Sequence, residues 1–202
     1  MITPLPGDPL GYDVVYLQAA TTTLRPILPP DYEWAARLVT DERNRDMVPV
    51  PLWDAELPAA LDFIYTTTIC NFVVAEPAND FPLGVVGVST GEFSTQAGSL
   101  RLLLDPDFPG DPTVHDGVRL FLHYVFTGWN FRKLRAQFPE GTRPLAAIRQ
   151  ALTVDGNPLY VEEGRLSNHL VRENGFADLV MLTLPRTTWE AHRADLTPPP
   201  AA

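Results

Sequence analysis

The side chains best suited to moving protons lie in predicted strands or just beyond one. They are Glu92, Glu162 or its neighbour Glu163, Ser167 and His169. A carboxylate can act as a general base, and an imidazole gains or loses a proton near neutral pH, so these residues are candidates for acid–base catalysis. Each also has a structural interpretation, because strand-end carboxylates are commonly solvated charges and a histidine is often held by structural hydrogen bonds.

Ser167 and His169 are separated by one residue in a segment that alternates like a β-strand. Alternation would place them on one face of the strand and Asn168 on the other. Asp178 stands in the next apolar segment, where an uncompensated carboxylate is costly. We therefore expect Asp178 to accept hydrogen bonds that fix this pair of strands.

The cysteine and the remaining histidines do not suggest a metal centre. Cys70 is the single cysteine, which allows no intrachain disulfide and is read as a buried, small hydrophobic residue. His115, His123 and His192 are too scattered along the chain to form a ligand set. No metal is predicted.

The composition is that of one globular domain with an acidic surface. The chain has 202 residues, of which 45% are hydrophobic and 20% charged, and its net charge is −10. This charge disfavours binding to nucleic acid and favours cationic or neutral substrates. No apolar run approaches the roughly 20 residues of a membrane span, and the N-terminus lacks the features of a signal peptide, so a cytoplasmic protein without membrane contact is expected.

Hydrophobic periodicity predicts alternating groups of helices and strands. Strands are expected at 21–27, 72–76, 83–88, 100–104, 133–138, 160–173 and 176–184, and helices at 31–39, 53–66, 116–130 and 144–152. The strand, helix and strand between 100 and 138 form a βαβ unit, which predicts parallel pairing at that point. The pair Asn174-Gly175 predicts a hairpin between the last two strands.

The proline-rich ends set the expected domain limits. Residues 1–19 are interpreted as an N-terminal arm, 20–195 as a single domain and 196–202 as a disordered tail.

The order of these elements and a C-terminal set of motifs resemble the GNAT superfamily of N-acetyltransferases, and most closely the branch of ribosomal-protein alanine N-acetyltransferases. The residues that carry the resemblance are Glu162-Glu163-Gly164, His169, Gly175-Phe176, Asp178, the apolar strand 180–184 and Trp189. The resemblance covers roughly residues 22–189, and it is weakest between 137 and 159. It implies an α+β fold with a central mixed, mostly antiparallel sheet of about seven strands flanked by helices.

The resemblance also implies acetyl-CoA as a co-substrate. In such a domain, a bulge in the fourth strand opens the sheet and its backbone binds the pantetheine arm. By position this strand is Leu102-Leu103-Leu104. The pyrophosphate would then lie against the loop and helix start within 105–116, where backbone N–H groups and the helix dipole attract anions.

That loop departs from the family pattern. The family's basic residue is replaced by Pro109, and its two small residues by Pro112 and Val114. Proline lacks a backbone donor, and valine is expected to crowd the close approach that glycine permits. The remaining contacts are expected from Gly110, Thr113, Val114 and His115.

Transfer of an acetyl group to an amine needs a base and a group that polarises the thioester carbonyl. Under the resemblance, Glu92, Glu162, Ser167 and His169 would supply these roles. Aromatic residues near the second helix, namely Trp53, Phe63 and Tyr65, would form a wall of the acceptor pocket.

Three functions stay open at this point. The first is an acyl-CoA-dependent N-acyltransferase whose acceptor is a small-molecule amine or a protein N-terminus. The second is a catalytically inactive binding or assembly protein with the same fold and a degenerate CoA loop. The third keeps catalysis with another donor. The resemblance is compatible with a homodimer.

Overall fold

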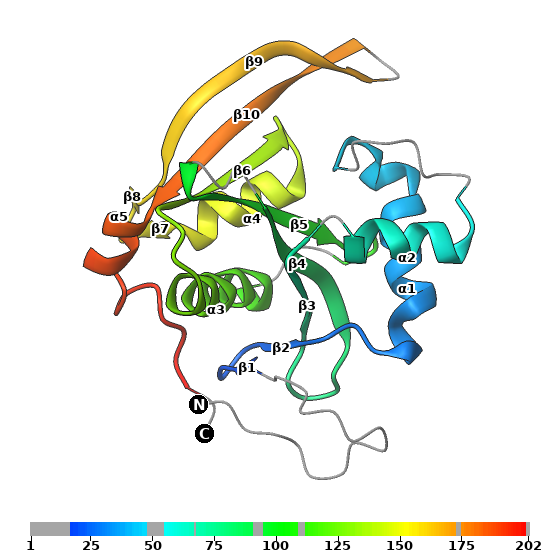
Figure 1. Ribbon diagram of the computed structural model, residues 1–202, viewed down its shortest axis with the longest axis horizontal. Coiled ribbons are helices and arrows are strands. Elements are labelled where there is room, and N and C mark those ends of the chain that lie inside the picture. Colours follow the sequence, from blue (N-terminus) through cyan, green and yellow to red (C-terminus); the bar gives the residue numbers. More distant parts are fainter. Residues whose placement is uncertain are drawn as a thin grey trace.

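The computed structural model describes residues 17–47, 55–66, 68–90, 95–108, 112–172 and 175–200. Its centre is an eight-stranded sheet with the order β1-β2-β3-β4-β5-β6-β10-β9, and helices cover both faces (Figure 1). The strands are β1 (Leu17–Gln18), β2 (Thr23–Arg25), β3 (Cys70–Ala75), β4 (Pro82–Thr90), β5 (Ala97–Leu104), β6 (Lys133–Pro139), β9 (Val161–Arg172) and β10 (Gly175–Pro185). A separate small sheet pairs β7 (Thr153–Val154) with β8 (Asn157–Pro158).

The helices lie between the strands in chain order. They are η1 (Pro29–Asp31), α1 (Tyr32–Thr40), η2 (Glu42–Met47), α2 (Leu57–Thr66), α3 (Pro112–Gly128), α4 (Arg143–Ala151) and α5 (Arg186–Ala191). No helix among the described residues is long and apolar enough to span a bilayer.

The pairing of the strands confirms the predicted fold class. Every neighbouring pair in the large sheet is antiparallel except β5 and β6, which are parallel and are connected through α3. The βαβ unit and the terminal antiparallel pair β9–β10 were both predicted. Residue 174 of the predicted turn lies outside the described residues, and β10 starts at Gly175, whose φ of +133° suits glycine.

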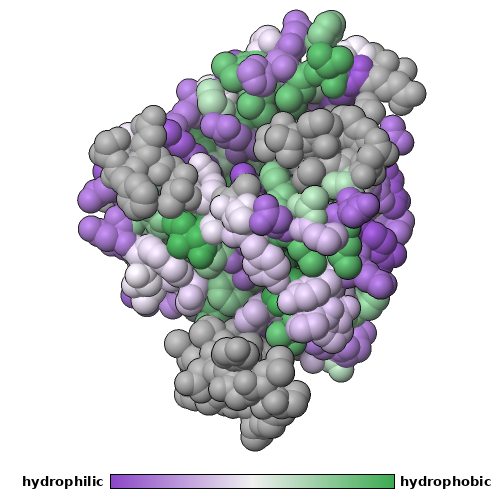
Figure 2. Space-filling model, turned by 45° about the vertical axis from the view of Figure 1, so that its right-hand side comes forward, coloured by the Kyte–Doolittle hydropathy of each residue, from purple (hydrophilic) through white to green (hydrophobic). Residues whose placement is uncertain are grey.

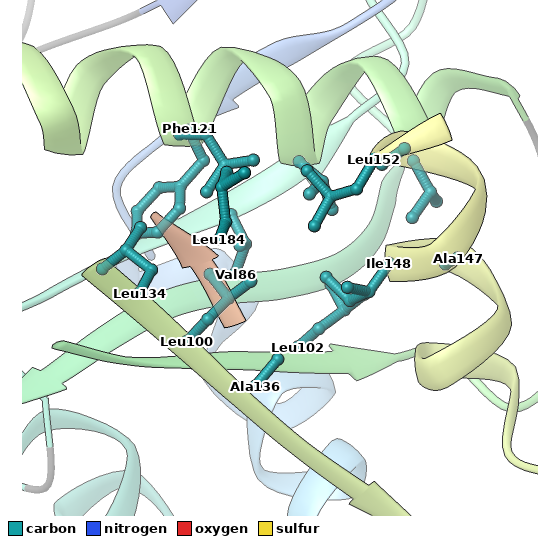
Figure 3. Packing of buried hydrophobic residues seen from close by; sticks show 14 of the residues in the cluster. Val86, Leu100, Leu102, Phe121, Leu134, Ala136, Ala147, Ile148, Leu152 and Leu184 are labelled. Atoms are coloured by element: carbon teal, nitrogen blue, oxygen red, sulfur yellow. The ribbon is translucent and has the colours of Figure 1, made fainter. Parts of the chain in front are cut away.

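Each face of the sheet has its own hydrophobic core. On one face α3 and α4 pack on the sheet, and Phe121, Ile148, Leu102 and Leu134 belong to this cluster (Figure 3). On the other face α1 and α2 pack on the sheet and form a second hydrophobic cluster, to which Val73 of β3 belongs. The sheet is therefore packed between two hydrophobic cores, one on each face.

Helix α3 begins four residues before the predicted start at 116, because Pro112 occupies its first turn. Proline suits that position, where its missing N–H costs no intrahelical hydrogen bond. Val114 and Val118 are both buried and extend the apolar face by one turn. Part of the predicted loop is therefore helical.

The ends of the domain lie further out than predicted. Leu17 and Gln18 pair with β2, although they fall in the expected arm. Leu196 is 1% exposed, the Ala20 N–H donates to the Pro199 carbonyl, and Ala19 forms a β-bridge with Pro200, although 196–202 was expected to be disordered. The apolar side chain of Leu196 and these backbone hydrogen bonds hold both ends on the sheet.

The β9–β10 hairpin extends past the body of the sheet (Figure 1). Its outer residues Val171 and Phe176 are 77% and 66% exposed. Polar and apolar side chains lie next to each other at this end of the molecule (Figure 2). Strand β9 is an edge of the large sheet.

Candidate functional site

The sheet opens where the two parallel strands diverge. Strands β5 and β6 pair from Ala97 and Lys133 to Leu100 and Ala136, and the ladder stops there although both strands continue. A cavity of about 380 Å³ lies at this divergence, and we call it the cleft. The described residues lining it are Met47, Phe63, Ser89, Ser99, Leu100, Arg101, Leu102, Leu103, Gln137, Phe138, His169, Leu170 and Leu179.

The edge of β5 presents backbone groups to the cleft. The Asp105 N–H donates to the Leu83 carbonyl on β4. Because backbone groups alternate between the two edges of an antiparallel strand, those of Leu102 and Leu104 point toward β6. The β4–β5 register is unbroken from Thr90 opposite Gly98 to Gly84 opposite Leu104, so the bulge expected in this strand is absent from it. The opening arises from divergence of β5 and β6 alone.

The side chain of Asn44 in η2 is hydrogen-bonded to this edge of β5. Its side-chain Nδ2 donates to the Leu104 carbonyl at 3.0 Å and to the Leu38 carbonyl at 2.9 Å, and the residue is 6% exposed. The contact ties η2 to the end of β5, and Met47 at the end of η2 lines the cleft. The Leu104 carbonyl therefore already accepts a hydrogen bond, whereas Leu102 lines the cleft.

The predicted anion-binding residues form the first turn of α3. Thr113 and Val114 are buried, and His115 is half-buried. The N–H groups of a first helical turn point out of the helix end and attract anions. The Val114 side chain packs in the core with α3 and the sheet rather than at the surface of this helix end. Gly110 lies outside the described residues.

Arg101 brings a cation into the cleft. It lies on β5 opposite Gly87, and its Cζ is 5.3 Å from the centroid of the Phe63 ring on α2. Burial lowers the pKa of Arg101.

Of the three aromatic residues predicted to form a wall of the acceptor pocket, Phe63 lines the cleft. Tyr65 does not line it, and its hydroxyl donates to the Ile27 carbonyl at 3.4 Å. Trp53 lies outside the described residues.

His169 reaches the cleft through a bulge in β9. Leu170 pairs with Ala177 and Leu166 with Leu179, so the three residues between Leu166 and Leu170 on β9 face a single residue on β10. The bulge breaks the predicted alternation, because the consecutive residues His169 and Leu170 both line the cleft. Ser167 is exposed and is not among the lining residues.

Asp178 holds this bulge. Its Oδ1 accepts a hydrogen bond from the Asn168 N–H at 2.9 Å, and Asn168 has the left-handed φ of +52°. Asparagine tolerates that conformation better than most residues. The prediction that Asp178 fixes the hairpin through hydrogen bonds is confirmed.

The paired glutamates of β9 form ion pairs away from the cleft. Glu162 lies 3.3 Å from both Arg149 and Arg165. A hydrogen bond from Lys133, 2.5 Å away, lowers the pKa of Glu163, which weakens it as a base. Neither glutamate lines the cleft, and Glu92 lies outside the described residues.

The other large cavity lies beside α1 and carries mainly paired charges. Its volume is about 500 Å³, and Asp41 and Asp107 on its wall both pair with Arg43 at 2.7 Å. Asp105 accepts a hydrogen bond from the Trp34 indole at 2.8 Å.

Among the described residues, no group of three or more His, Cys, Asp or Glu side chains could hold a metal ion.

The sequence reasoning missed Arg101 and Asn44. Arg101 interrupts the otherwise apolar run from Leu100 to Leu104, and a lone charge in a buried strand is a signal that could have identified it. Asn44 stands in a polar segment, so composition does not distinguish it from its neighbours.

No protein-family model matches this chain, and no curated protein sequence matches it. Solved structures do match over most of its length. A GNAT-family acetyltransferase from Bacillus anthracis is 13% identical, with a TM-score of 0.66, and the match covers 85% of this chain and 99% of that one.

Two further solved structures have named substrates. A spermidine N-acetyltransferase from Vibrio cholerae, in complex with CoA and spermine, is 18% identical with a TM-score of 0.66, over 84% of this chain and 98% of that one. A ribosomal-protein-S5-alanine acetyltransferase from Vibrio fischeri is 18% identical with a TM-score of 0.63, over 87% and 98%. At these identities the similarity establishes the fold: this chain has the GNAT acetyltransferase fold, as its sequence motifs predicted.

Proposed function

We propose that this protein transfers an acetyl group from acetyl-CoA to an amine. The observation that carries the proposal is the divergence of β5 and β6 beyond Leu100, with the first turn of α3 following β5 in the chain. This arrangement combines a strand edge for an extended arm with a helix start for a diphosphate. The acceptor is an amine of a small molecule or a protein N-terminus.

Three parts of the structure would each bind one part of acetyl-CoA. The backbone of Leu102 on the β5 edge would bind the amides of the pantetheine arm. The N–H groups at the start of α3, from Thr113 to His115, would bind the pyrophosphate, and the helix dipole favours negative charge there. The thioester would then lie in the cleft near Leu103 and His169.

The reaction is a direct transfer that needs no nucleophile on the protein. The amine nitrogen forms a bond to the thioester carbonyl carbon, and the bond from that carbon to sulfur breaks. The proton lost by the amine passes to a base, and the CoA thiolate gains a proton. Among the described residues that line the cleft, His169 is the one with an imidazole side chain, the group that most often acts as a general base in enzymes.

The first test is calorimetric titration of the protein with acetyl-CoA, and we expect a micromolar dissociation constant. His115→Glu should weaken binding by about tenfold or more, because it places a negative charge at the helix start that holds the pyrophosphate. His192→Glu is the matched control, since it makes the same change of charge beyond α5, and it should bind like the unmodified protein. Absence of binding at millimolar acetyl-CoA would overturn the proposal.

A second test concerns His169. We expect His169→Gln to lower kcat by about 100-fold, in the range for loss of a general base. The pH dependence that remains should be that of protonation of the amine acceptor alone, because glutamine is not a base. The measurement is release of the CoA thiol over a range of pH with one amine acceptor, and His192→Gln serves as the control. An unchanged pH profile would assign His169 a structural role.

A binding or assembly protein without catalysis is the second candidate. The hydrogen bond from Asn44 to the Leu104 carbonyl favours it, because that bond uses part of the strand edge that a pantetheine arm needs. The proline residues at 109 and 112 point the same way, since proline has no backbone N–H to donate at these two positions. The acetyl-CoA titration distinguishes the two candidates.

A further inference from the structure

The direction of the His169 side chain depends on the bulge in β9. Neighbouring residues of a regular strand point to opposite faces, so His169 would point away from the cleft that its neighbour Leu170 lines. It lines the cleft instead, because residues 167–169 lie opposite the single residue Asp178 of β10. A bulge of this kind re-aims a side chain. The bulge therefore gives His169 its access to the cleft.

The bulge contains a backbone conformation that most residues avoid. Asn168 has a φ of +52°, in the left-handed region where asparagine is enriched and a β-branched residue is an outlier. Its N–H donates to the Asp178 Oδ1 at 2.9 Å. This hydrogen bond fixes the residue immediately before His169.

Asp178 is itself held in place by the neighbouring strands. Its Oδ2 lies 3.6 Å from Arg165, and Arg165 also lies 3.0 Å from Glu140. The Asp178 carbonyl accepts a hydrogen bond from the Glu140 N–H at 2.8 Å, directly after the end of β6. By contrast, no hydrogen bond or ion pair joins the His169 side chain to the part of the chain that the structure describes. The imidazole therefore takes its direction from the backbone.

We propose that Asp178 is a positioning residue for acetyl transfer, because its carboxylate holds the bulge that directs His169 into the cleft. The inference rests on the proposed function, in which His169 is the base. A base acts only within hydrogen-bond reach of the proton that it removes, and a misplacement of about 1 Å can cost about 100-fold in rate. Asp178 does not line the cleft, so it acts on the reaction through His169.

The first test compares two variants that differ in one hydrogen-bond acceptor. Asp178→Leu removes the acceptor and should lower kcat by about tenfold or more. Asp178→Asn keeps an acceptor oxygen of the same shape and should retain most of the activity. The dissociation constant for acetyl-CoA should be unchanged in both variants. Equal losses of kcat in the two variants would overturn the inference.

A double variant separates positioning from a general structural role. Asp178→Leu combined with His169→Gln should be no slower than His169→Gln alone, because residues that act through one another are not additive. Additive losses would show that Asp178 acts independently of His169, which contradicts the inference.

Substitutions of Asn168 test the backbone conformation without touching Asp178. Asn168→Gly should retain activity, because glycine adopts a positive φ readily. Asn168→Val should lose activity as Asp178→Leu does, because a β-branched residue avoids that conformation. The reverse ranking would be incompatible with a positioning bulge. Asn168→Val also replaces Asp178→Leu in every measurement if the latter does not fold.

A crystal structure of Asp178→Leu gives a result that does not depend on activity. We expect the His169 imidazole to lie outside the cleft in this variant, and an unchanged ring position would overturn the inference. Failure of the proposed function is a separate result, since it appears as absent binding of acetyl-CoA to the unmodified protein. The crystal structure tests the positioning of His169 in that case as well.

Discussion

Replacement of Arg25 by methionine is expected to lower the free energy of unfolding by about 3–5 kcal/mol, the cost of breaking a buried ion pair from one side. The Arg25 and Asp31 side chains are 4% and 9% exposed and form a two-point contact with N–O distances of 2.5 and 3.0 Å. Burial alone lowers the pKa of Arg25, but hydrogen bonds to Asp31 and Asp80 outweigh it, so the net pKa is raised. Methionine would leave the Asp31 carboxylate buried without its cation.

The change is measured as a fall of roughly 6–20 °C in Tm, or as the corresponding shift in urea denaturation. The double variant Arg25→Met with Asp31→Leu should be more stable than Arg25→Met alone, because it removes the stranded charge. A loss of less than about 1 kcal/mol in the single variant would contradict this account of the pair. The pair joins β2 to the start of α1, and α1 leads into η2 at the cleft.

Phe121→Ala is expected to cost about 3–5 kcal/mol, as for other buried phenylalanines reduced to alanine. Phe121 is fully buried on α3, and its ring meets Phe72 edge to face with centroids 6.1 Å apart. Its side chain lies among Leu134, Leu184 and others between α3 and the sheet (Figure 3). Both the helix and the strands that flank it restrict collapse of the resulting cavity.

The free energy of unfolding from urea titration tests this prediction. Phe176→Ala is the matched control, because Phe176 is 66% exposed, and its change should stay within about 0.5 kcal/mol. A small effect at Phe121 would mean that the core repacks around the cavity. Equal effects at the two positions would show that burial does not determine their contributions.

Sequence patterns predicted the fold because its elements are long and periodic. The faces of α3 and α4 and the apolar runs of β3, β4 and β5 carry strong signals, and the parallel pairing followed from the βαβ order. The patterns did not reveal β1 or the pairing of residues 199–200 with the first strands. Short segments such as Leu17–Gln18 owe their structure to tertiary contacts, which local sequence does not encode.

Strand position predicted which of the candidate residues lie at the cleft, and it did not predict their roles. Leu102, Leu103 and His169 were expected near one cleft, and all three line it. Glu162 was expected there as well, but Arg149 and Arg165 draw it into an ion-pair network. Strand alternation failed at Ser167, because the bulge at Asn168 changes the phase of the strand, and a bulge depends on the partner strand.

The predicted preference for cationic or neutral substrates followed from net charge, which averages over the whole surface. Arg101 instead stands at one position in the cleft, which net charge does not describe. Single charges inside a cleft are invisible to composition, and they become interpretable only when the lining residues are known.

The bulge at Asn168 also affects how this protein behaves when concentrated. Strand β9 is an open edge of twelve residues, and a long, flat edge strand is a template on which other chains can add and aggregate. The bulge interrupts the ladder on this strand and increases its local twist, while Arg165 and Arg172 add charge along it. The Asp178 carboxylate that holds the bulge is therefore expected also to disfavour the addition of a further strand to β9.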